Sequence, residues 1–325
     1  MSSAVSTVNP LLNIDTDFRS YLNIYTRSFQ NHLIDGQLDY AFDSDFAVRQ
    51  KIVGLSGWNR FAKSINTTDV TAEAKALFVK CEQAGALKYT NVYQILKNCC
   101  ERLELALPIV LIRKDYDRAL IYSIATEMID PCIVITEQLL EMCSDEELEL
   151  LIGGECGRIQ NNHCTYNWAF TYLNHNSDTY RPAEKSFKGS VNPQIIGALS
   201  EWIHYADCTA DRGSMICMEN PGRFIDLFCG LCEKGFVDFF GRSQRSIRMD
   251  RIRNSVEKNS VTVARNLVRD TSLSEIERRA VAAAEFLNSE SFFSWRRDVQ
   301  ASDTHRFSGE VCNVRCSIIL SGGQG

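Results

Sequence analysis

The sequence has no run of about 18 or more apolar residues, the length that a helix needs to cross a bilayer. Its N-terminal stretch, MSSAVSTVNPLLNIDTDF, lacks the basic segment and the long apolar segment of a secretory signal peptide. These two absences argue against a membrane partner and against export. We therefore expect a cytoplasmic protein.

A large net charge is also missing. The chain carries a formal net charge of −6, and its pI is near 5.5. Neither value provides the positive field that attracts nucleic acid or an anionic lipid surface, so we expect no nucleic-acid partner. A phosphate-binding glycine loop is absent too, because Gly153 and Gly154 fall inside a predicted helix and Gly322 and Gly323 are close to the C-terminal end.

Cysteine, in contrast, is abundant, with 13 residues. Without a secretion signal, most of these residues are expected to be reduced thiols. Cys229 and Cys232 have the C-x-x-C spacing of a redox or metal half-site, but Cys312 and Cys316 do not supply a second pair at zinc spacing. Burial as small hydrophobic side chains is the favoured interpretation of the cysteines.

Hydrophobic periodicity predicts an α+β fold that is mostly helical. Helices are expected at 17–36, 69–87, 90–105, 137–163, 195–218, 221–240 and 274–298. Strands expected at 109–112, 119–124 and 132–136 form a small antiparallel or mixed sheet. Residues 174–194 have the composition of a loop. From residue 311 onward the sequence predicts a short β-like run that is followed by a flexible end. We divide the chain into a helical N-terminal extension (1–85), a main domain (86–298) and a C-terminal tail (299–325).

One predicted helix has an unusual motif. Within 145-DEELELLIGGECGRIQNNH-163, the window Gly154-Glu155-Cys156-Gly157-Arg158 has the spacing of the zinc-protease motif H-E-x-x-H but neither of its histidines. Ser144, followed three residues later by Glu147, forms a capping box that opens this helix.

Three segments in this order resemble the gluzincin zinc metallopeptidases of the HtpX and prenyl-protease type. The matching residues are Leu139, Leu140, Ser144, Asp145, Glu147 and Leu148 before the motif helix, Glu155, Gly157, Ile159 and His163 on it, and Ala210, Asp211 and Arg212 on a later helix. The resemblance covers roughly residues 85–295 and implies a zincin-like fold with a small sheet and an active-site helix. A lone GECGR would not be specific, but the ordered set of three segments is.

The departures from the family pattern affect the metal site. In the family, two His and one carboxylate hold Zn²⁺, and the Glu of the motif takes a proton from the zinc-bound water. Here Gly154 and Arg158 stand at the two His positions, and Asp207 corresponds to the third ligand. Glu155 is retained as a vestigial general base. Zinc is the cofactor that the family implies, and we expect neither zinc nor another cofactor in this chain.

Arg158 suggests what replaces the metal. Without Zn²⁺, the carboxylates of Glu155, Asp207 and Asp211 would repel one another in a partly buried place. A guanidinium one turn after Glu155 supplies a positive charge and binds carboxylates through two N–H groups. We therefore hypothesise that Arg158 takes the structural place of the metal. The alternative is an exposed Arg158 that points to solvent.

A relocated metal site is a second alternative. His204, Asp207 and Asp211 are spaced i, i+3, i+7 and share one helical face, where Glu155 or His163 could join them. His163 and His204 are otherwise expected to be structural, hydrogen-bonded residues. A Cys–His hydrolase is more weakly motivated, because Cys156, next to the motif Glu, is expected to face the core.

The favoured function is that of a pseudoprotease, a catalytically inactive protein that keeps a groove for a peptide or protein partner. The resemblance places the groove along an edge strand before the motif helix, which corresponds to Cys132, Ile133, Val134, Ile135 and Thr136. The alternative is an enzyme with a relocated metal or with altered hydrolase chemistry that uses Glu155 and Asp207. The Cys-containing and Gly-containing tail is expected to be a disordered terminus or a segment that a partner modifies.

Overall fold

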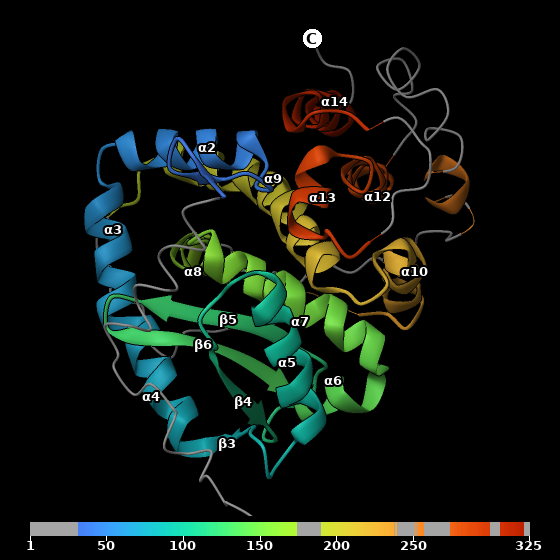
Figure 1. The fold of residues 1–325 in the computed structure, drawn as a ribbon. Helices are drawn as coiled ribbons and strands as arrows, with labels where there is room; N and C mark the ends of the chain where they lie inside the picture. The colour runs from blue at the N-terminus through green and yellow to red at the C-terminus, as the bar shows by residue number, and fades with distance from the viewer. Residues whose placement is uncertain are drawn as a thin grey trace, which may run out of the picture.

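The computed structural model describes most of the chain. The described residues are 32–173, 190–236, 238, 250, 252–256, 274–299 and 306–321. Most of the predicted helix at 17–36 and of the predicted loop at 174–194 lies outside them. The fold is α+β and mostly helical, as predicted (Figure 1). No helix in the described ranges combines the length and the apolar character needed to cross a membrane.

Helices surround a small sheet. They are α2 (Asp43–Gly54), α3 (Trp58–Ser64), the π-helix η2 (Ile65–Val70), α4 (Thr71–Lys80), α5 (Thr90–Arg102), α6 (Glu137–Met142), α7 (Asp145–Gln160), α8 (Cys164–Leu173), α9 (Pro193–Cys217), the 3-10 helix η3 (Pro221–Arg223), α10 (Phe224–Glu233), α12 (Glu275–Phe286), α13 (Glu290–Trp295) and α14 (Gly309–Ser321). A hairpin of two short strands, β1 (Leu33–Ile34) and β2 (Gln37–Leu38), precedes α2. β1 lies within the last residues of the helix predicted at 17–36, so that helix prediction is wrong for these residues.

The sheet is mixed, and its strand order is β3-β4-β6-β5. These strands are β3 (Glu82–Gln83), β4 (Ile109–Arg113), β5 (Ile121–Thr126) and β6 (Ile129–Thr136). β6 pairs parallel with β4 and antiparallel with β5. The prediction that Cys132–Thr136 form the groove at an edge strand is therefore wrong, because β6 has a neighbour on each side and these residues are fully buried. The edge strands are β3 and β5, and β5 packs against α7.

Alternating side chains of the sheet enter two hydrophobic clusters. Ile121 and Ile133 belong to the cluster that includes α5 and α7, whereas Tyr122 and Val134 belong to the cluster that includes α3, α4 and Trp168 of α8. Helices α2 to α4 contribute buried residues to the second cluster. The described part of the N-terminal extension thus shares a core with the sheet.

Helices α7 and α9 approach each other closely because glycines line their contact. A Cβ atom on Gly153 would lie 2.7 Å from Cys217 Cβ and 3.1 Å from Ser214 Cα. A Cβ atom on Gly213 would lie 3.0 Å from Gly157 Cα. The first of these three distances is shorter than real Cβ contacts and the other two are unusually tight, so the two glycines let the backbones meet. This close approach brings the face of α7 that carries Gly153 and Gly157 against α9.

The substitution Gly153→Ala is expected to lower the free energy of unfolding by about 1–3 kcal/mol, because the added methyl group overpacks the contact between α7 and α9. The matched control is Gly197→Ala on α9, where no atom lies within 4 Å of the added Cβ. Reduced backbone entropy of the unfolded chain should make that variant more stable by about 0.4–1 kcal/mol. Urea unfolding of both variants measures the difference, and equal stabilities would contradict the close packing.

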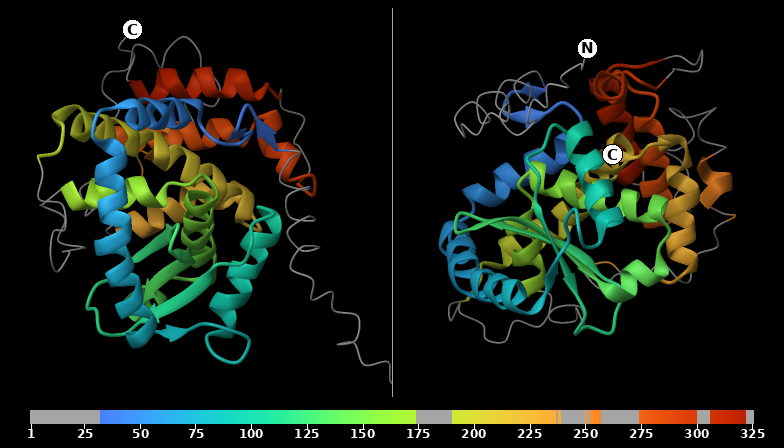
Figure 2. Two further views of the ribbon diagram at one scale, coloured as in Figure 1. Left: turned by 90° about the vertical axis from the view of Figure 1, so that its left-hand side faces the viewer. Right: turned by 60° about the horizontal axis from the view of Figure 1, so that its bottom comes forward.

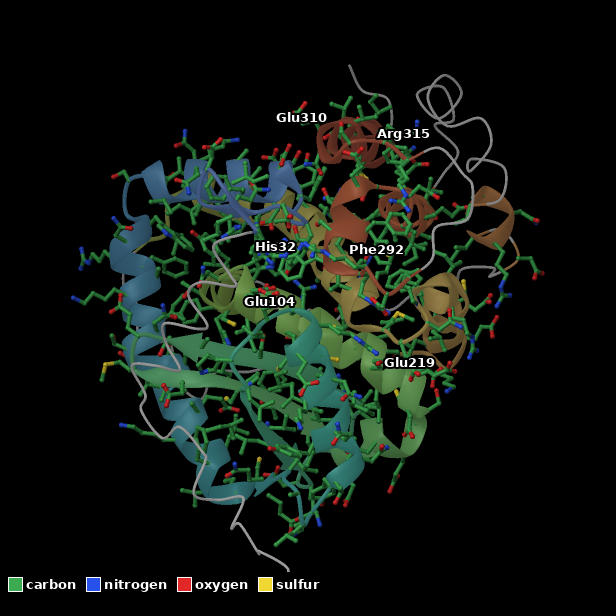
Figure 3. All side chains as sticks on the ribbon, in the orientation of Figure 1. His32, Glu104, Glu219, Phe292, Glu310 and Arg315 are labelled. Carbon is green, nitrogen blue, oxygen red and sulfur yellow. The ribbon has the colours of Figure 1, made fainter. Side chains whose placement is uncertain are left out.

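Residues Gly309–Ser321 form a packed helix, not the β-like run that we predicted. The predicted flexible end after Ser321 lies outside the described residues. α14 packs against α12 on the side of the molecule where α2 crosses α9 (Figure 2). Cys312 and Cys316 are buried, and Arg212 of α9 donates to their Sγ atoms at 3.7 and 3.4 Å. Arg315 of α14, labelled in Figure 3, donates from Nε to Glu285 Oε2 at 2.5 Å. The prediction relied on the apolar run 317-SIIL-320, which resembles a strand. Cys312 and Cys316 are four residues apart, a helical spacing that the prediction did not use.

Candidate active site

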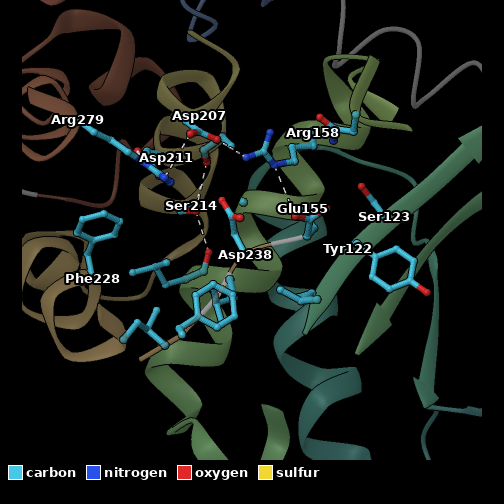
Figure 4. Close-up of a pocket in the computed structure, with 18 of the residues that line it drawn as sticks. Tyr122, Ser123, Glu155, Arg158, Asp207, Asp211, Ser214, Phe228, Asp238 and Arg279 are labelled. Carbon is cyan, nitrogen blue, oxygen red and sulfur yellow. Dashed lines mark hydrogen bonds and ion pairs between the residues drawn. The ribbon is translucent and has the colours of Figure 1, made fainter. Parts of the chain in front are cut away.

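A pocket opens between α7, α9, α10 and the start of β5 (Figure 4). It contains about 910 Å³ of empty space, part of which is open to solvent. Apolar side chains of β5, α7, α10 and the segment after α10 line one part of the pocket. They are Ile121, Leu150, Leu151, Phe228, Leu231 and Phe236. The charged lining residues are Glu155, Arg158, Asp207, Asp211, Asp238 and Arg279. Amphipathic lining of this kind is typical of ligand sites.

The start of α7 is fixed by the predicted capping box. The backbone N–H of Glu147 donates to Ser144 Oγ at 3.3 Å, and the backbone N–H of Ser144 donates to Glu147 Oε2 at 2.8 Å. With the helix register set, Glu155 and Arg158 follow at i and i+3 on one face. Both residues line the pocket, as the sequence predicted.

Arg158 lies between two of the predicted carboxylates. Its Nη2 donates to Asp207 Oδ1 at 2.7 Å, and its Nε lies 3.6 Å from Glu155 Oε1 (Figure 4). Arg158 is only 7% exposed, so the alternative of a solvent-pointing Arg158 is wrong. Buried charges require partners of opposite sign, and here a guanidinium bridges the carboxylates of α7 and α9.

Arg279 of α12 is a second cation in the pocket, and the sequence analysis missed it. Its Nε and Nη2 donate to the two oxygens of Asp211 at 2.6 Å each, and its Nη1 lies 3.4 Å from Asp207 Oδ2. Burial alone would lower the pKa of Arg279, but Asp211 and Asp207 raise it well above its ordinary value. The motif residues Asp207 and Asp211 are thus held in an ion-pair network with Arg158 and Arg279.

Glu155 is the least strongly paired of these acids. Burial raises the pKa of Glu155 above its ordinary value, and the charge of Arg158 offsets part of that shift. Hydrogen bonds from the side chain and backbone of Ser123 on β5 lower it further, whereas the nearby Asp238 raises it. Glu155 therefore connects the motif helix to the edge strand, and it holds its proton more readily than an exposed glutamate does.

The two histidines proposed for a relocated metal site do not lie at the pocket. His163 is fully buried, and its Nε2 lies 2.8 Å from Asp45 Oδ2 on α2. The His204 side chain is 42% exposed and lies 2.7 Å from Glu275 Oε1. The prediction that either residue joins Asp207 and Asp211 is wrong, because neighbours on α2 and α12 hold both imidazoles elsewhere.

Across the residues that the structure describes, no group of three or more His, Cys, Asp or Glu side chains is arranged to hold a metal ion. At the position of the first His of the H-E-x-x-H motif, a Cβ on Gly154 would meet Ser214 Oγ at 2.9 Å, so α9 fills the space where a longer side chain would begin. At the second, the guanidinium of Arg158 has no lone pair to donate to a metal. The donor set therefore does not fit zinc.

A Cys–His pair is not formed near the motif. Cys156 is fully buried, as predicted for a core-facing residue. Burial raises the pKa of Cys164 to about 12, which keeps this thiol protonated at neutral pH. His163, the nearest histidine in the sequence, is bound to Asp45. This arrangement supplies no activated nucleophile.

Comparisons with protein-family models, with curated proteins and with solved structures find no match for this chain.

Besides Arg279, further polar lining residues were missed by the sequence analysis, among them an acid, a serine and an asparagine. Asp238 follows α10, Ser123 lies on β5, and Asn167 lies on α8. None of them belongs to a spaced motif, and each comes from a different part of the chain. The one available signal for Arg279 was its position in the predicted helix at 274–298.

Proposed function

We propose that this protein is a pseudoprotease of the zincin type, which binds an extended peptide or a segment of a partner protein at the pocket and does not cleave it through zinc. The ion pair of Arg158 with Asp207 carries the proposal. A fixed guanidinium lies between the motif Glu and the acid of the later helix, where the family resemblance would put a metal. The charge that neutralises these acids is covalently part of the chain.

The edge of the sheet supports peptide binding. β5 is the outer strand next to α7, and Ile121 to Ser123 line the pocket. An outer strand offers backbone groups to an added strand. At Ser123 the backbone is already engaged, because Trp168 Nε1 donates to Ser123 O at 3.3 Å and Glu155 hydrogen-bonds this residue. We therefore infer that a peptide lies beside the start of β5 at Ile121 and inserts a side chain into the pocket.

A second candidate function is hydrolase chemistry without zinc. The raised pKa of Glu155 in a pocket favours it, because general acids and bases often have perturbed pKa values. Against it, Asp207 is bound by Arg158 and Arg279 and is not available as a partner base. Loss of a measured hydrolase activity in Glu155→Gln would establish this alternative over the pseudoprotease.

The binding function is testable with peptides selected from a random display library on the full chain. We expect fluorescence anisotropy to show saturable binding that a chelator does not change, with the peptide intact after incubation. Phe236→Ala, which removes an aromatic wall of the pocket, should weaken binding about tenfold or more.

The matched control is Phe78→Ala on α4, an exposed phenylalanine outside the pocket. It should leave peptide affinity unchanged. Equal affinities of the Phe236→Ala variant and the unchanged chain would place peptide binding elsewhere. Zinc-dependent cleavage of the peptides would overturn the proposal as a whole.

A further inference from the structure

We propose that three buried cysteines of α9 and α14 form a site that hydrogen peroxide oxidises. They are Cys208, Cys312 and Cys316. Arg212 holds Cys316 as a thiolate, and oxidation joins Cys316 to Cys208 in a disulfide that links the two helices. The inference concerns a second site and does not rest on peptide binding.

Arg212 of α9 is a buried cation whose contacts are mostly neutral. It is only 2% exposed. Its neutral partners are two backbone oxygens, one amide oxygen and two aromatic rings: Tyr40, Ala41, Asn313, Phe42 and Phe286. A guanidinium does not lose its proton in proteins, and a buried charge is costly unless a charge of opposite sign lies beside it. The neutral partners satisfy N–H groups but leave the net charge of Arg212 without a counter-ion.

Two acids lie near the three cysteines, and each pairs with another arginine. Asp211 precedes Arg212 in α9, but its two carboxylate oxygens accept hydrogen bonds from Arg279 at 2.6 Å each. Glu285 of α12 accepts a hydrogen bond from Arg315 Nε at 2.5 Å. Among the residues that the structure describes, no carboxylate forms an ion pair with Arg212. Burial alone would lower the pKa of Arg212, but the charges of the three cysteines raise it above its ordinary value.

The donors around the three thiols converge on Cys316. Arg212 Nη2 lies 3.4 Å from Cys316 Sγ and 3.7 Å from Cys312 Sγ. The thiols of Cys208 and Cys312 also donate hydrogen bonds to Cys316. These two hydrogen bonds and the charge of Arg212 lower the pKa of Cys316 below its ordinary value, although burial raises it. Cys316 is therefore the thiol that supplies the negative charge opposite Arg212.

A neutral Cys316 is the competing arrangement. Its Sγ lies 3.5 Å from Ala282 O, an acceptor that a protonated thiol would use. In that arrangement the guanidinium of Arg212 has no anion in contact, which is the costly state for a buried charge. The two arrangements differ by one proton on sulfur, so a measurement of thiolate separates them.

Helical geometry selects the pair of cysteines that peroxide joins. Cys312 and Cys316 are one turn apart on α14, where Cβ atoms are about 5–6 Å apart, whereas a disulfide needs about 3.5–4.5 Å. Cys208 lies on another helix and hydrogen-bonds Cys316. It is therefore the partner.

The oxidation takes two steps. Peroxide transfers one oxygen atom to the Cys316 thiolate, which gives a sulfenic acid and hydroxide. The Cys208 thiol then attacks the sulfenic sulfur, which forms the S–S bond while the sulfenic hydroxyl leaves with the Cys208 proton as water. The hydroxide from the first step takes a proton from the solvent. Peroxide is little larger than water, so a local opening of α14 admits it.

The first test measures the ultraviolet absorbance of thiolate in the native full chain. We expect one equivalent at neutral pH, below the pKa of about 8.5 of an ordinary cysteine. Arg212→Met removes the positive charge and should lose this absorbance. Arg296→Met is the matched control and should keep it, because Arg296 is equally buried but pairs with Asp298 at 2.8 Å. A native chain without thiolate at neutral pH, or equal absorbance of the two variants, would overturn the proposal.

The second test treats the native full chain with hydrogen peroxide and maps its cysteines by peptide mass spectrometry after alkylation in denaturant. We expect a disulfide between Cys208 and Cys316 that dithiothreitol reverses. In Cys208→Ser, which lacks the second thiol, dimedone should trap a sulfenic acid at Cys316. A disulfide between Cys312 and Cys316, or oxidation of Cys316 in the unfolded chain alone, would overturn the proposed site.

Cys143 is the comparison thiol within the same experiment. It is more exposed than Cys316. Burial raises the pKa of Cys143 to about 12, so at neutral pH its thiol stays protonated. If thiolate character decides the reaction, Cys143 reacts with peroxide at least about tenfold more slowly than Cys316. An equal or faster reaction of Cys143 would show that exposure decides instead, which contradicts a site built around Arg212.

Discussion

The substitution Asp45→Ala is expected to lower the free energy of unfolding by about 3–5 kcal/mol, the range for breaking a buried ionic network by removal of one partner. Asp45 is fully buried on α2. Its donors are Arg49 Nε at 3.0 Å, Trp202 Nε1 at 2.7 Å, Thr209 Oγ1 at 2.8 Å and, through Nε2, His163 at 2.8 Å. Alanine would leave these donors unsatisfied, and it would separate α2 from α9 and from the end of α7.

Asp43→Ala on the same helix is the matched control. Asp43 is exposed, and in the described part of the chain its side chain accepts one hydrogen bond, from Gln37 Nε2 at 3.2 Å, so its loss should cost less than about 1 kcal/mol. Denaturant unfolding measures the free energy of unfolding of both variants, and an unchanged m-value shows that the variants unfold as the unchanged chain does. A loss below about 1 kcal/mol for Asp45→Ala would show that this network does not hold the helices together.

The Asp45 effect also depends on pH in a defined direction. Burial alone would raise the pKa of Asp45, but His163, Arg49 and Thr209 lower it well below its usual range. A lowered pKa in the folded state means that the contribution is fully present above the unfolded value of about 3.9 and is lost as pH falls through the lower folded value. The difference in stability between the unchanged chain and Asp45→Ala should therefore be constant near neutral pH and shrink below about pH 4.

The substitution Arg158→Ala is expected to lower the free energy of unfolding by about 3 kcal/mol. It removes the partner of Asp207 and the nearest cation of Glu155, both of them buried or nearly so. The loss lies at the low end of the range for buried pairs because Arg279 still contacts Asp207. Because Arg158 lowers the pKa of Glu155, the variant should also hold the Glu155 proton to a higher pH.

Arg223→Ala is the control for this variant. Arg223 pairs with Glu146, and both side chains are about half exposed, so the pair should contribute less than about 1 kcal/mol. Chemical unfolding of the two variants under identical salt conditions provides the comparison. Equal and small losses would mean that Arg158 is a replaceable surface-type charge and not the structural replacement of a metal.

The part of the site that the sequence predicted depends on local spacing. A capping box sets the register of α7, and the i, i+3 spacing of Glu155 and Arg158 puts both on one face. Asp207 and Asp211, four residues apart on α9, face the same pocket for the same reason. Helical periodicity alone therefore brings these residues to two facing helices.

The parts that the sequence did not predict are contacts between distant segments. Asp45 lies in a region that was interpreted as an extension, and its partners are more than 100 residues away, with the exception of Arg49. The inner position of β6 depends on which strands pair, which hydrophobic alternation does not reveal. Arg279 lies on a helix whose face toward the pocket is fixed by its packing against α9.

The most direct test of the central claim is a calorimetric zinc titration of the metal-free full chain, with elemental mass spectrometry of the protein as purified. If Arg158 neutralises the acids of α7 and α9 in place of a metal, the titration shows no saturable binding at one equivalent and the purified protein contains substoichiometric metal. One equivalent of tightly bound zinc, lost together with Asp207→Ala, would contradict the account and make this pocket a metal centre.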